Sequence, residues 1–129
     1  MQRIYLPCRG NNLPDRRQVQ GGHIMASDEQ HPAFTGVALK HILTSEETDG
    51  AYSYHLVRIA PNCSIGEHIH ETQLETHEVI AGNGTCINEG TAITYGPGII
   101  SVFPANVPHE VNAGEDGLCL FTKFMPALC

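Results

Sequence analysis

From residue 37 onward, hydrophobic and polar residues alternate in short runs, and each run is followed by residues typical of turns. Alternation with a period of two over a few residues predicts half-buried β-strands. No segment keeps helical periodicity for longer than two turns. The predicted strands are residues 37–44, 52–60, 67–71, 74–81, 85–88, 91–95, 99–103, 110–112 and 118–125. Many short strands between regular turn signals favour an all-β fold, either a barrel or a sandwich.

Residues 1–35 have a different pattern, rich in glycine, proline, asparagine, aspartate and glutamine, with few hydrophobic runs. We interpret them as an extended N-terminal arm with at most one short strand, and residues 36–129 as the barrel domain. A chain of 129 residues has room for one domain and one core. Such an arm either packs against a partner subunit or remains loose.

Composition is that of an ordinary globular protein, with 41% hydrophobic and 16% charged residues. The net charge of −7, from 14 acidic and 7 basic residues, argues against nucleic acids and anionic membranes as partners, because neither would be attracted. The sequence has no run of eighteen apolar residues that could form a transmembrane helix. The first ten residues also lack the apolar stretch of a signal peptide, so we expect a cytoplasmic protein.

The five cysteines are an odd number at irregular spacings, without a C-x-x-C pair. This pattern favours free, mostly buried thiols over a disulfide framework or a zinc finger. The eight histidines are more unusual, and five of them lie between residues 55 and 109.

His68 and His70 are separated by one residue inside a predicted strand, so their side chains point to the same face. Glu75 opens the next strand, and His109 follows the strand 99–103. Three neutral imidazoles and one carboxylate suit Fe(II), Mn(II), Zn(II), Ni(II) or Cu(II), and they leave a coordination position open for catalysis. From these residues alone, solvated surface histidines or a hydrogen-bonded core cluster remain the alternative.

The stretch 62–82 resembles the first motif of the cupin family. In that motif a glycine is followed by five residues, H-x-H, three or four residues, a glutamate, six residues and a second glycine. The matching residues here are His68, His70, Glu75 and Gly82. Asn62 replaces the first glycine. Asparagine is the side-chain-bearing residue that best tolerates a positive φ, so this change preserves the expected backbone conformation.

The stretch 98–109 resembles the second cupin motif. That motif runs from a glycine through five residues, a proline, one residue, a turn glycine and two residues to a histidine. Gly98, Pro104 and His109 match it, and Asn106 replaces the turn glycine with the same tolerance of positive φ. The asparagine that usually ends this motif would fall at Ala113, one residue after Asn112.

The resemblance implies a single barrel of the double-stranded β-helix type, also described as jelly-roll-like. It implies one divalent metal ion, of unassigned identity among Fe, Mn, Ni, Zn and Cu, on His68, His70, Glu75 and His109. Gln73 is the substitute ligand if Glu75 does not bind, and a cupin that works without metal is the competing interpretation. Single cupin domains commonly dimerise through N-terminal strands, so the arm favours a homodimer.

Three further residues are candidates for a catalytic role. His77 shares the inward direction of Glu75, and it would act as an acid or base or orient a ligand, unless it is a hydrogen-bonded core residue. Tyr54 and Arg58 share one face of the strand 52–60, whose opposite face is apolar enough to pack in the core. If their face lines the cavity, Arg58 would bind a substrate carboxylate through two hydrogen bonds. Otherwise Arg58 is a solvated rim residue.

These residues favour a metal-dependent enzyme acting on a small oxygen-bearing molecule such as an enediol, a dicarbonyl, a hydroxy acid or a catechol. Iron would suit dioxygenase chemistry, and manganese, nickel or zinc would suit isomerase or lyase chemistry. The fold resemblance does not choose among these reactions. A non-catalytic module that binds a small molecule or a metal is the alternative, and a purely structural barrel agrees poorly with four intact ligands.

Overall fold

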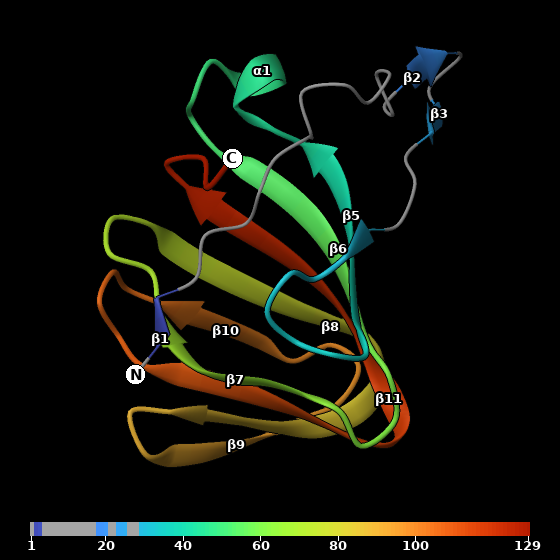
Figure 1. Cartoon of the computed structure of the whole chain (residues 1–129), viewed down its shortest axis with the longest axis vertical. Helices are drawn as coiled ribbons and strands as arrows, with labels where there is room; N and C mark the ends of the chain where they lie inside the picture. Colours follow the sequence, from blue (N-terminus) through green and yellow to red (C-terminus); the bar gives the residue numbers. More distant parts are fainter. Residues whose placement is uncertain (1, 4–17, 21–22, 26–28) are drawn as a thin grey trace.

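The computed structural model describes residues 2–3, 18–20, 23–25 and 29–129 (Figure 1). Its strands are β1 (Gln2–Arg3), β2 (Gln18–Gln20), β3 (His23–Met25), β4 (Glu29–Gln30), β5 (Val37–Leu43), β6 (Ser53–Ile59), β7 (Ser64–Ile69), β8 (Leu74–Asn88), β9 (Thr91–Tyr95), β10 (Ile100–Phe103) and β11 (His109–Met125). A short helix, α1 (Ser45–Thr48), lies between β5 and β6. Within these residues, no helix has the length and apolar character needed to cross a membrane.

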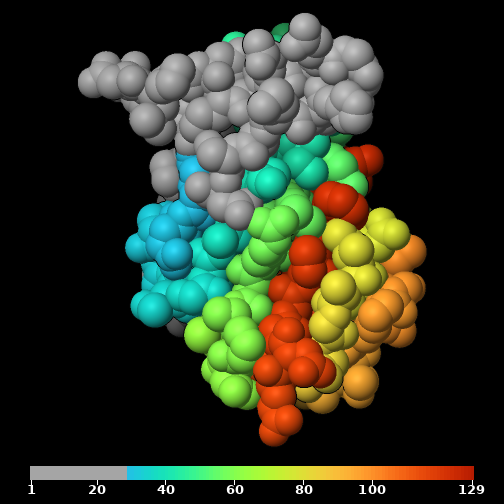
Figure 2. Space-filling view, turned by 90° about the vertical axis from the view of Figure 1, so that its right-hand side faces the viewer, coloured from blue at the N-terminus to red at the C-terminus, as the bar shows by residue number. Residues whose placement is uncertain are grey.

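The long strands β8 and β11 organise the barrel, because they pair with each other along both of their halves. The C-terminal half of β11 also pairs with β6, and its N-terminal half pairs with β7. In the same way, β8 pairs with β10 through its first residues and with β9 through its last. Figure 2 shows segments of β6 (green), β11 (red) and β8 (yellow) running side by side across one face. Two sheet layers therefore share these long strands and enclose one interior.

Two glycines allow β8 and β11 to bend where the layers meet. Gly82 and Gly117 have φ angles of +84° and +74°, a conformation that residues with a side chain rarely adopt. A Cβ atom on Gly82 would lie 2.1 Å from the carbonyl oxygen of Gly117, so the two strands approach too closely there for any side chain. The pairing of the strands shifts register next to this contact, between Ala113 and Leu118, as in a β-bulge.

Alternate residues of each strand point into the barrel. On β6 the inward residues are buried, and they are Ser53, His55, Val57 and Ile59. This burial confirms the prediction that this face of the strand packs in the core. Tyr95, Phe103 and Leu120 are among the large side chains that are almost completely buried between the layers. The interior is also unusually rich in imidazole, because seven histidines are buried: His31, His41, His55, His68, His70, His77 and His109.

The predicted all-β barrel is confirmed, but some predicted strand boundaries are wrong. The strands predicted at 74–81 and 85–88 form the single strand β8, because the glycines between them bend the chain without reversing it. The predicted strands 110–112 and 118–125 merge into β11 for the same reason. β7 begins at Ser64, before the predicted start at residue 67.

Local turn chemistry agrees with the sequence at the two asparagines that replace motif glycines. Asn62 has a φ of 59° and Asn106 a φ of 65°, which confirms the predicted left-handed conformation. The predicted turn after residue 44 contains α1 instead. There the Thr44 hydroxyl accepts a hydrogen bond from the Glu46 backbone N–H, and the Glu47 carboxylate accepts one from the Thr44 N–H, which completes a capping box.

Most of the predicted arm, residues 1–35, lies outside the described residues. Of its described parts, β1 pairs with β7, β2 pairs with β3, and β4 extends the sheet at β5. These are four short strands, so the prediction of at most one strand in the arm is wrong. The division of the chain into an arm and a barrel at residue 35 stays a prediction.

The cysteines are only partly as predicted. Cys63, Cys86 and Cys119 are free, whereas Cys129 is disulfide-bonded. The prediction of free thiols is therefore wrong for Cys129, because an odd number of cysteines at irregular spacings does not exclude one disulfide beside free thiols.

Candidate metal centre

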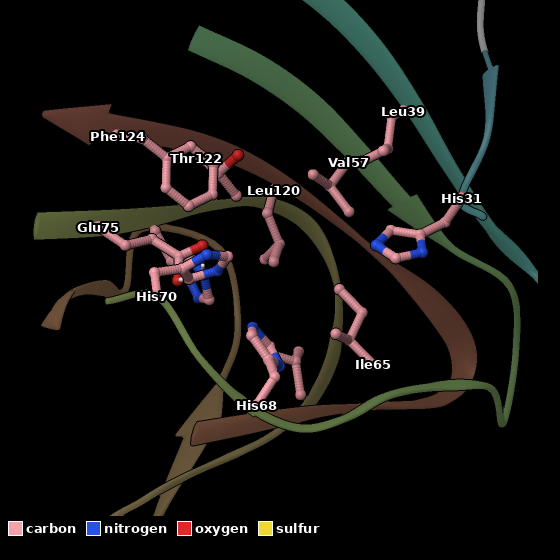
Figure 3. Close-up of a pocket in the computed structure, with 12 residues that line it drawn as sticks. His31, Leu39, Val57, Ile65, His68, His70, Glu75, Leu120, Thr122 and Phe124 are labelled. Carbon is pink, nitrogen blue, oxygen red and sulfur yellow. Dashed lines mark ion pairs between the residues drawn. The ribbon is translucent and has the colours of Figure 1, made fainter. Parts of the chain in front are cut away.

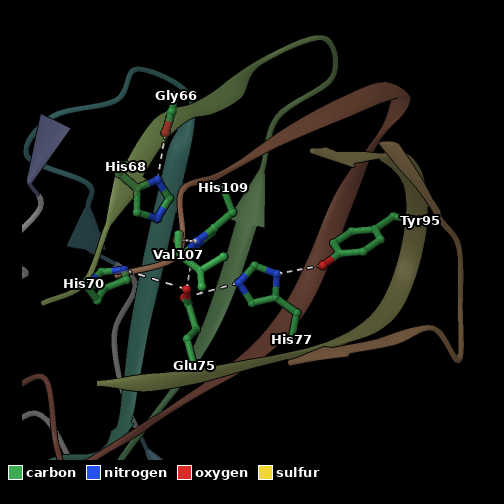
Figure 4. Close-up of polar contacts among 8 residues, drawn as sticks. All are labelled: Gly66, His68, His70, Glu75, His77, Tyr95, Val107 and His109. Carbon is green, nitrogen blue, oxygen red and sulfur yellow. Dashed lines mark hydrogen bonds and ion pairs between the residues drawn. The ribbon is translucent and has the colours of Figure 1, made fainter. Parts of the chain in front are cut away.

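Four buried side chains converge at one point inside the barrel (Figure 4). The register of β7 and β11 places His68 opposite His109, and the alternation along the chain brings His70 to the same side as His68. Glu75, near the start of β8, faces them from the neighbouring strand. One potential ligand atom of each residue lies within 4.8 Å of all the others, so the four can reach a single ion.

Two of the imidazoles are held in a known tautomer by backbone carbonyls. Nδ1 of His68 lies 2.7 Å from the carbonyl oxygen of Gly66, and Nδ1 of His109 lies 3.0 Å from that of Val107. A carbonyl oxygen only accepts hydrogen bonds, so Nδ1 carries the proton in both rings. In the neutral rings, the lone pairs are therefore on Nε2, where a metal ion would bind them.

The carboxylate of Glu75 is ionised despite its burial. Burial alone would raise the pKa of Glu75, but the charge of His77 and the contacts with His109 and His77 outweigh it and hold the pKa well below its usual range. Oε1 lies 2.6 Å from Nε2 of His109, and Oε2 lies 3.2 Å from Nε2 of His77. The same contact with Glu75 raises the pKa of His109, even though burial opposes that shift.

The centre contains buried polar atoms that lack hydrogen-bond partners. These atoms are Nδ1 of His70, Oε1 of Glu75 and Nε2 of His109. While Nε2 of His109 carries no proton, its 2.6 Å contact with Glu75 brings two lone pairs together, and only a cation between them would make it favourable. The nitrogen and oxygen donors present therefore fit one divalent ion of the first transition series.

His77 lies inward, as strand alternation predicts, and connects Glu75 to the core. Its Nε2 faces Oε2 of Glu75, and its Nδ1 lies 2.9 Å from the hydroxyl of Tyr95. An ionised carboxylate only accepts hydrogen bonds, so Nε2–H of His77 donates to Glu75. This chain of contacts fixes the carboxylate so that Oε1 is left for the metal.

A small cavity of about 30 Å³, with a mouth that opens to solvent, lies beside the centre (Figure 3). Its walls are mostly apolar, formed by Leu39, Val57, Ile65, Val111, Leu120 and Phe124. Besides the ligand side chains and His77, its polar lining consists of His31 and Thr122. Sequence patterns did not single out His31, because it precedes the first long strand and belongs to no motif.

Tyr54 and Arg58 lie on the outer face of the barrel. Tyr54 stacks on Phe121 with ring centroids 5.1 Å apart, and it lines an outer depression. Arg58 is exposed and lines a different one. Since alternation on β6 directs the opposite face into the cavity, the position of these two residues gives no support to the hypothesis that they bind substrate at the metal.

A second group of potential ligands lies at the other side of the core. Nδ1 of His41 and Nδ1 of His55 are 2.8 Å apart, and the sulfur of Cys129 lies close to them. The sulfur is part of a disulfide and is not a thiolate, so this group does not fit a metal ion as the first one does.

The structure is thus a small β-barrel in which three histidines and one glutamate that could hold a metal ion lie beside an internal cavity. The family model of the cupin domain matches residues 55–123, more than half of the 129-residue chain. The chain belongs to the cupin domain family. No functionally curated protein sequence matches it.

Solved structures of cupin fold are similar to this chain at low sequence identity. A predicted oxalate decarboxylase from Thermotoga maritima has a TM-score of 0.71 at 20% identity, with 84% of this chain and 98% of that chain covered. KdgF from Halomonas sp. has a TM-score of 0.69 at 19% identity, with 78% and 86% covered. Ectoine synthase from P. lautus has a TM-score of 0.67 at 16% identity, with 77% and 68% covered. At these identities the similarity establishes the fold alone.

Proposed function

We propose that this chain is a metal-dependent enzyme that acts on a small oxygen-bearing molecule. The observation that carries the proposal is the arrangement of His68, His109 and Glu75, whose free lone pairs face one point at the edge of an internal cavity. A divalent ion held by His68, His70, Glu75 and His109 would supply Lewis acidity to an oxygen of the substrate. The reaction is of the dioxygenase, isomerase or lyase type.

The protein's own residues prepare the site for such a substrate. The contacts of Glu75 with His77, and of His77 with Tyr95, hold the carboxylate in one orientation before a ligand arrives. The apolar walls exclude water from the space beside the centre, which strengthens electrostatic interactions there. Two similar structures carry enzyme names, a predicted oxalate decarboxylase and an ectoine synthase, which is compatible with catalysis on this fold.

A non-catalytic binding module is the second candidate. It is favoured by the shortage of groups for proton transfer, because both ring nitrogens of His77 already have partners. Incubation of the metal-loaded protein with a panel of hydroxy acids, dicarbonyls and catechols, followed by NMR, separates the two. New product signals support the enzyme, whereas line broadening of the added compound without product supports the binding module.

Metal content is the direct test of the centre. We expect the purified protein to hold about one equivalent of a divalent transition metal by elemental analysis, or to take it up from solution. The variants His70→Ala and Glu75→Gln should lose most of this uptake. Glu78→Gln is the matched control, because Glu78 lies on the same strand but is exposed.

An absence of metal in the protein and of uptake of any of Fe(II), Mn(II), Ni(II), Zn(II) or Cu(II) would overturn the proposal. Equal loss of uptake in Glu78→Gln would show that the effect is not specific to the centre. The homodimer and the cytoplasmic location remain part of the proposal, and size-exclusion chromatography of the full chain tests the homodimer.

A further inference from the structure

We infer that His31 positions the substrate by donating a hydrogen bond to a neutral oxygen at the end of the molecule that points away from the metal. This inference rests on the proposed function and deepens it. His31 belongs to no cupin motif in this sequence, and it reaches the cavity from the segment that follows β4.

The His31 ring is fixed in place by its own neighbourhood. Its backbone N–H donates to the carbonyl oxygen of Val37 at 2.7 Å, which ties the residue to the start of β5. The backbone N–H of Ala33 donates to Nδ1 of the ring at 2.9 Å. The Phe34 ring packs against it with centroids 5.0 Å apart, and the side chain is 6% exposed. His31 is thus a preorganised part of the cavity wall.

The contact with Ala33 determines which nitrogen of His31 carries the proton. A backbone N–H only donates, so Nδ1 accepts and the ring proton is on Nε2. Burial, followed by the charge of His70, lowers the pKa of His31 to about 4, so the ring is neutral near pH 7. His31 therefore offers the cavity one uncharged N–H donor.

Figure 3 shows the ring of His31 on the far side of the cavity from His70 and Glu75, with Ile65 and Leu120 between them. No arginine or lysine is among the described residues that line this cavity. A ligand that fits this arrangement has a metal-chelating oxygen end, an apolar middle and a neutral acceptor such as a ketone or an ether at its far end. A second carboxylate at that end would find no cation to neutralise it.

Hydroxamates provide the probe, because the hydroxamate group chelates divalent ions through two oxygens. The cobalt-loaded full-length protein is titrated with a series of alkyl hydroxamates of increasing length, each paired with an analogue that carries a ketone near its far end. Binding is followed by the absorption of the cobalt ion. We expect the ketone to bind about tenfold more tightly than its alkyl partner at the length that reaches His31, the effect of one buried hydrogen bond.

The variants His31→Leu and His31→Gln complete the test. In His31→Leu the preference for the ketone should disappear while cobalt uptake is unchanged, and in His31→Gln, which keeps an N–H donor, part of the preference should return. A preference that persists in His31→Leu, or none in the parent at any length, would overturn the inference. Failure of the parent to bind cobalt and each of the five ions named above would instead contradict the proposed metal centre, so the two failures are distinguishable.

Discussion

At the scale of single residues, the centre depends on where each proton is held. Backbone carbonyls fix the tautomers of His68 and His109, and the Tyr95 hydroxyl and His77 fix the orientation of Glu75. None of these partners is itself a proposed ligand. They determine how many lone pairs are directed at the ion, and so they should determine how tightly the ion is held.

Replacing Tyr95 by phenylalanine tests this dependence. The variant removes only the hydroxyl, which leaves Nδ1 of His77 buried without its partner and loosens the support of Glu75. We expect a fall in metal affinity of about tenfold, measured by competition with a chromophoric chelator. Tyr52→Phe is the control, because the Tyr52 ring lies under the amine of Lys123 outside the cavity. Equal metal affinities of the parent and Tyr95→Phe would show that the contact between Tyr95 and His77 does not affect how Glu75 holds the metal.

The buried His55 should make the metal-free protein sensitive to acid. Burial, and then the charge of His41, lower the pKa of His55 from 6.5 to about 3, although Glu75 opposes this shift. At pH values between these two pKa values, His55 is protonated in the unfolded chain but neutral in the folded protein. The contribution of His55 to the free energy of unfolding is therefore fully present above the pKa of His55 in the unfolded chain. As the pH falls below that pKa, the free energy of unfolding decreases by about 1.4 kcal/mol per pH unit for this group.

Urea unfolding of the metal-free protein at several pH values measures this effect. The variant His55→Gln, which cannot take up a proton, should depend less steeply on pH than the parent between about pH 6 and pH 4. Other buried histidines, such as His31, contribute to the slope of both proteins, so the difference between the slopes is the quantity of interest. Identical slopes would show that His55 is protonated equally in the folded and unfolded states.

At the scale of elements, the close approach of β8 and β11 at Gly82 shapes the barrel. Gly82→Ala should lower the free energy of unfolding by more than about 2 kcal/mol, because the new methyl group meets the Gly117 carbonyl as well as an unfavourable φ. Gly90→Ala is the matched control, since Gly90 has a similar φ of +82° but open space around it. It should cost about 1 kcal/mol. If urea unfolding showed that Gly82→Ala and Gly90→Ala lose the same free energy of unfolding, β8 and β11 would separate easily at Gly82.

The elements also show which sequence patterns were informative. Alternation correctly predicted the buried face of β6 and the inward direction of His77, because side-chain direction follows from strand geometry alone. Glycines were ambiguous, since Gly82 marks a bend within β8 whereas Gly90 closes a hairpin between β8 and β9. The difference depends on what packs against each glycine, and only the folded structure supplies that information.

At the scale of the whole molecule, strand alternation predicted the barrel. The set of His68, His70, Glu75 and His109 was predicted from the resemblance to two cupin motifs, and the structure brings the four side chains together. The cavity wall opposite the four candidate ligands could not be predicted, since His31 reaches it through contacts with Ala33 and Val37 that no spacing encodes. The sequence analysis predicted the buried face of β6 but kept open whether Arg58, on the other face, reaches a cavity, and the structure places Arg58 on the outside. The disulfide of Cys129 was missed for a similar reason, because a disulfide depends on proximity in the fold.

The 2.6 Å approach of Glu75 to His109 links the metal centre to the thermal behaviour of the whole chain. In the metal-free protein this contact opposes folding unless a proton occupies it, whereas an ion removes the conflict and binds only the folded state. Heat resistance should therefore rise with the free concentration of the ion, as it does for any ligand of the native state. The melting temperature should therefore report how much of the ion is available, and the metal-free chain should unfold and be degraded sooner than the metal-bound chain.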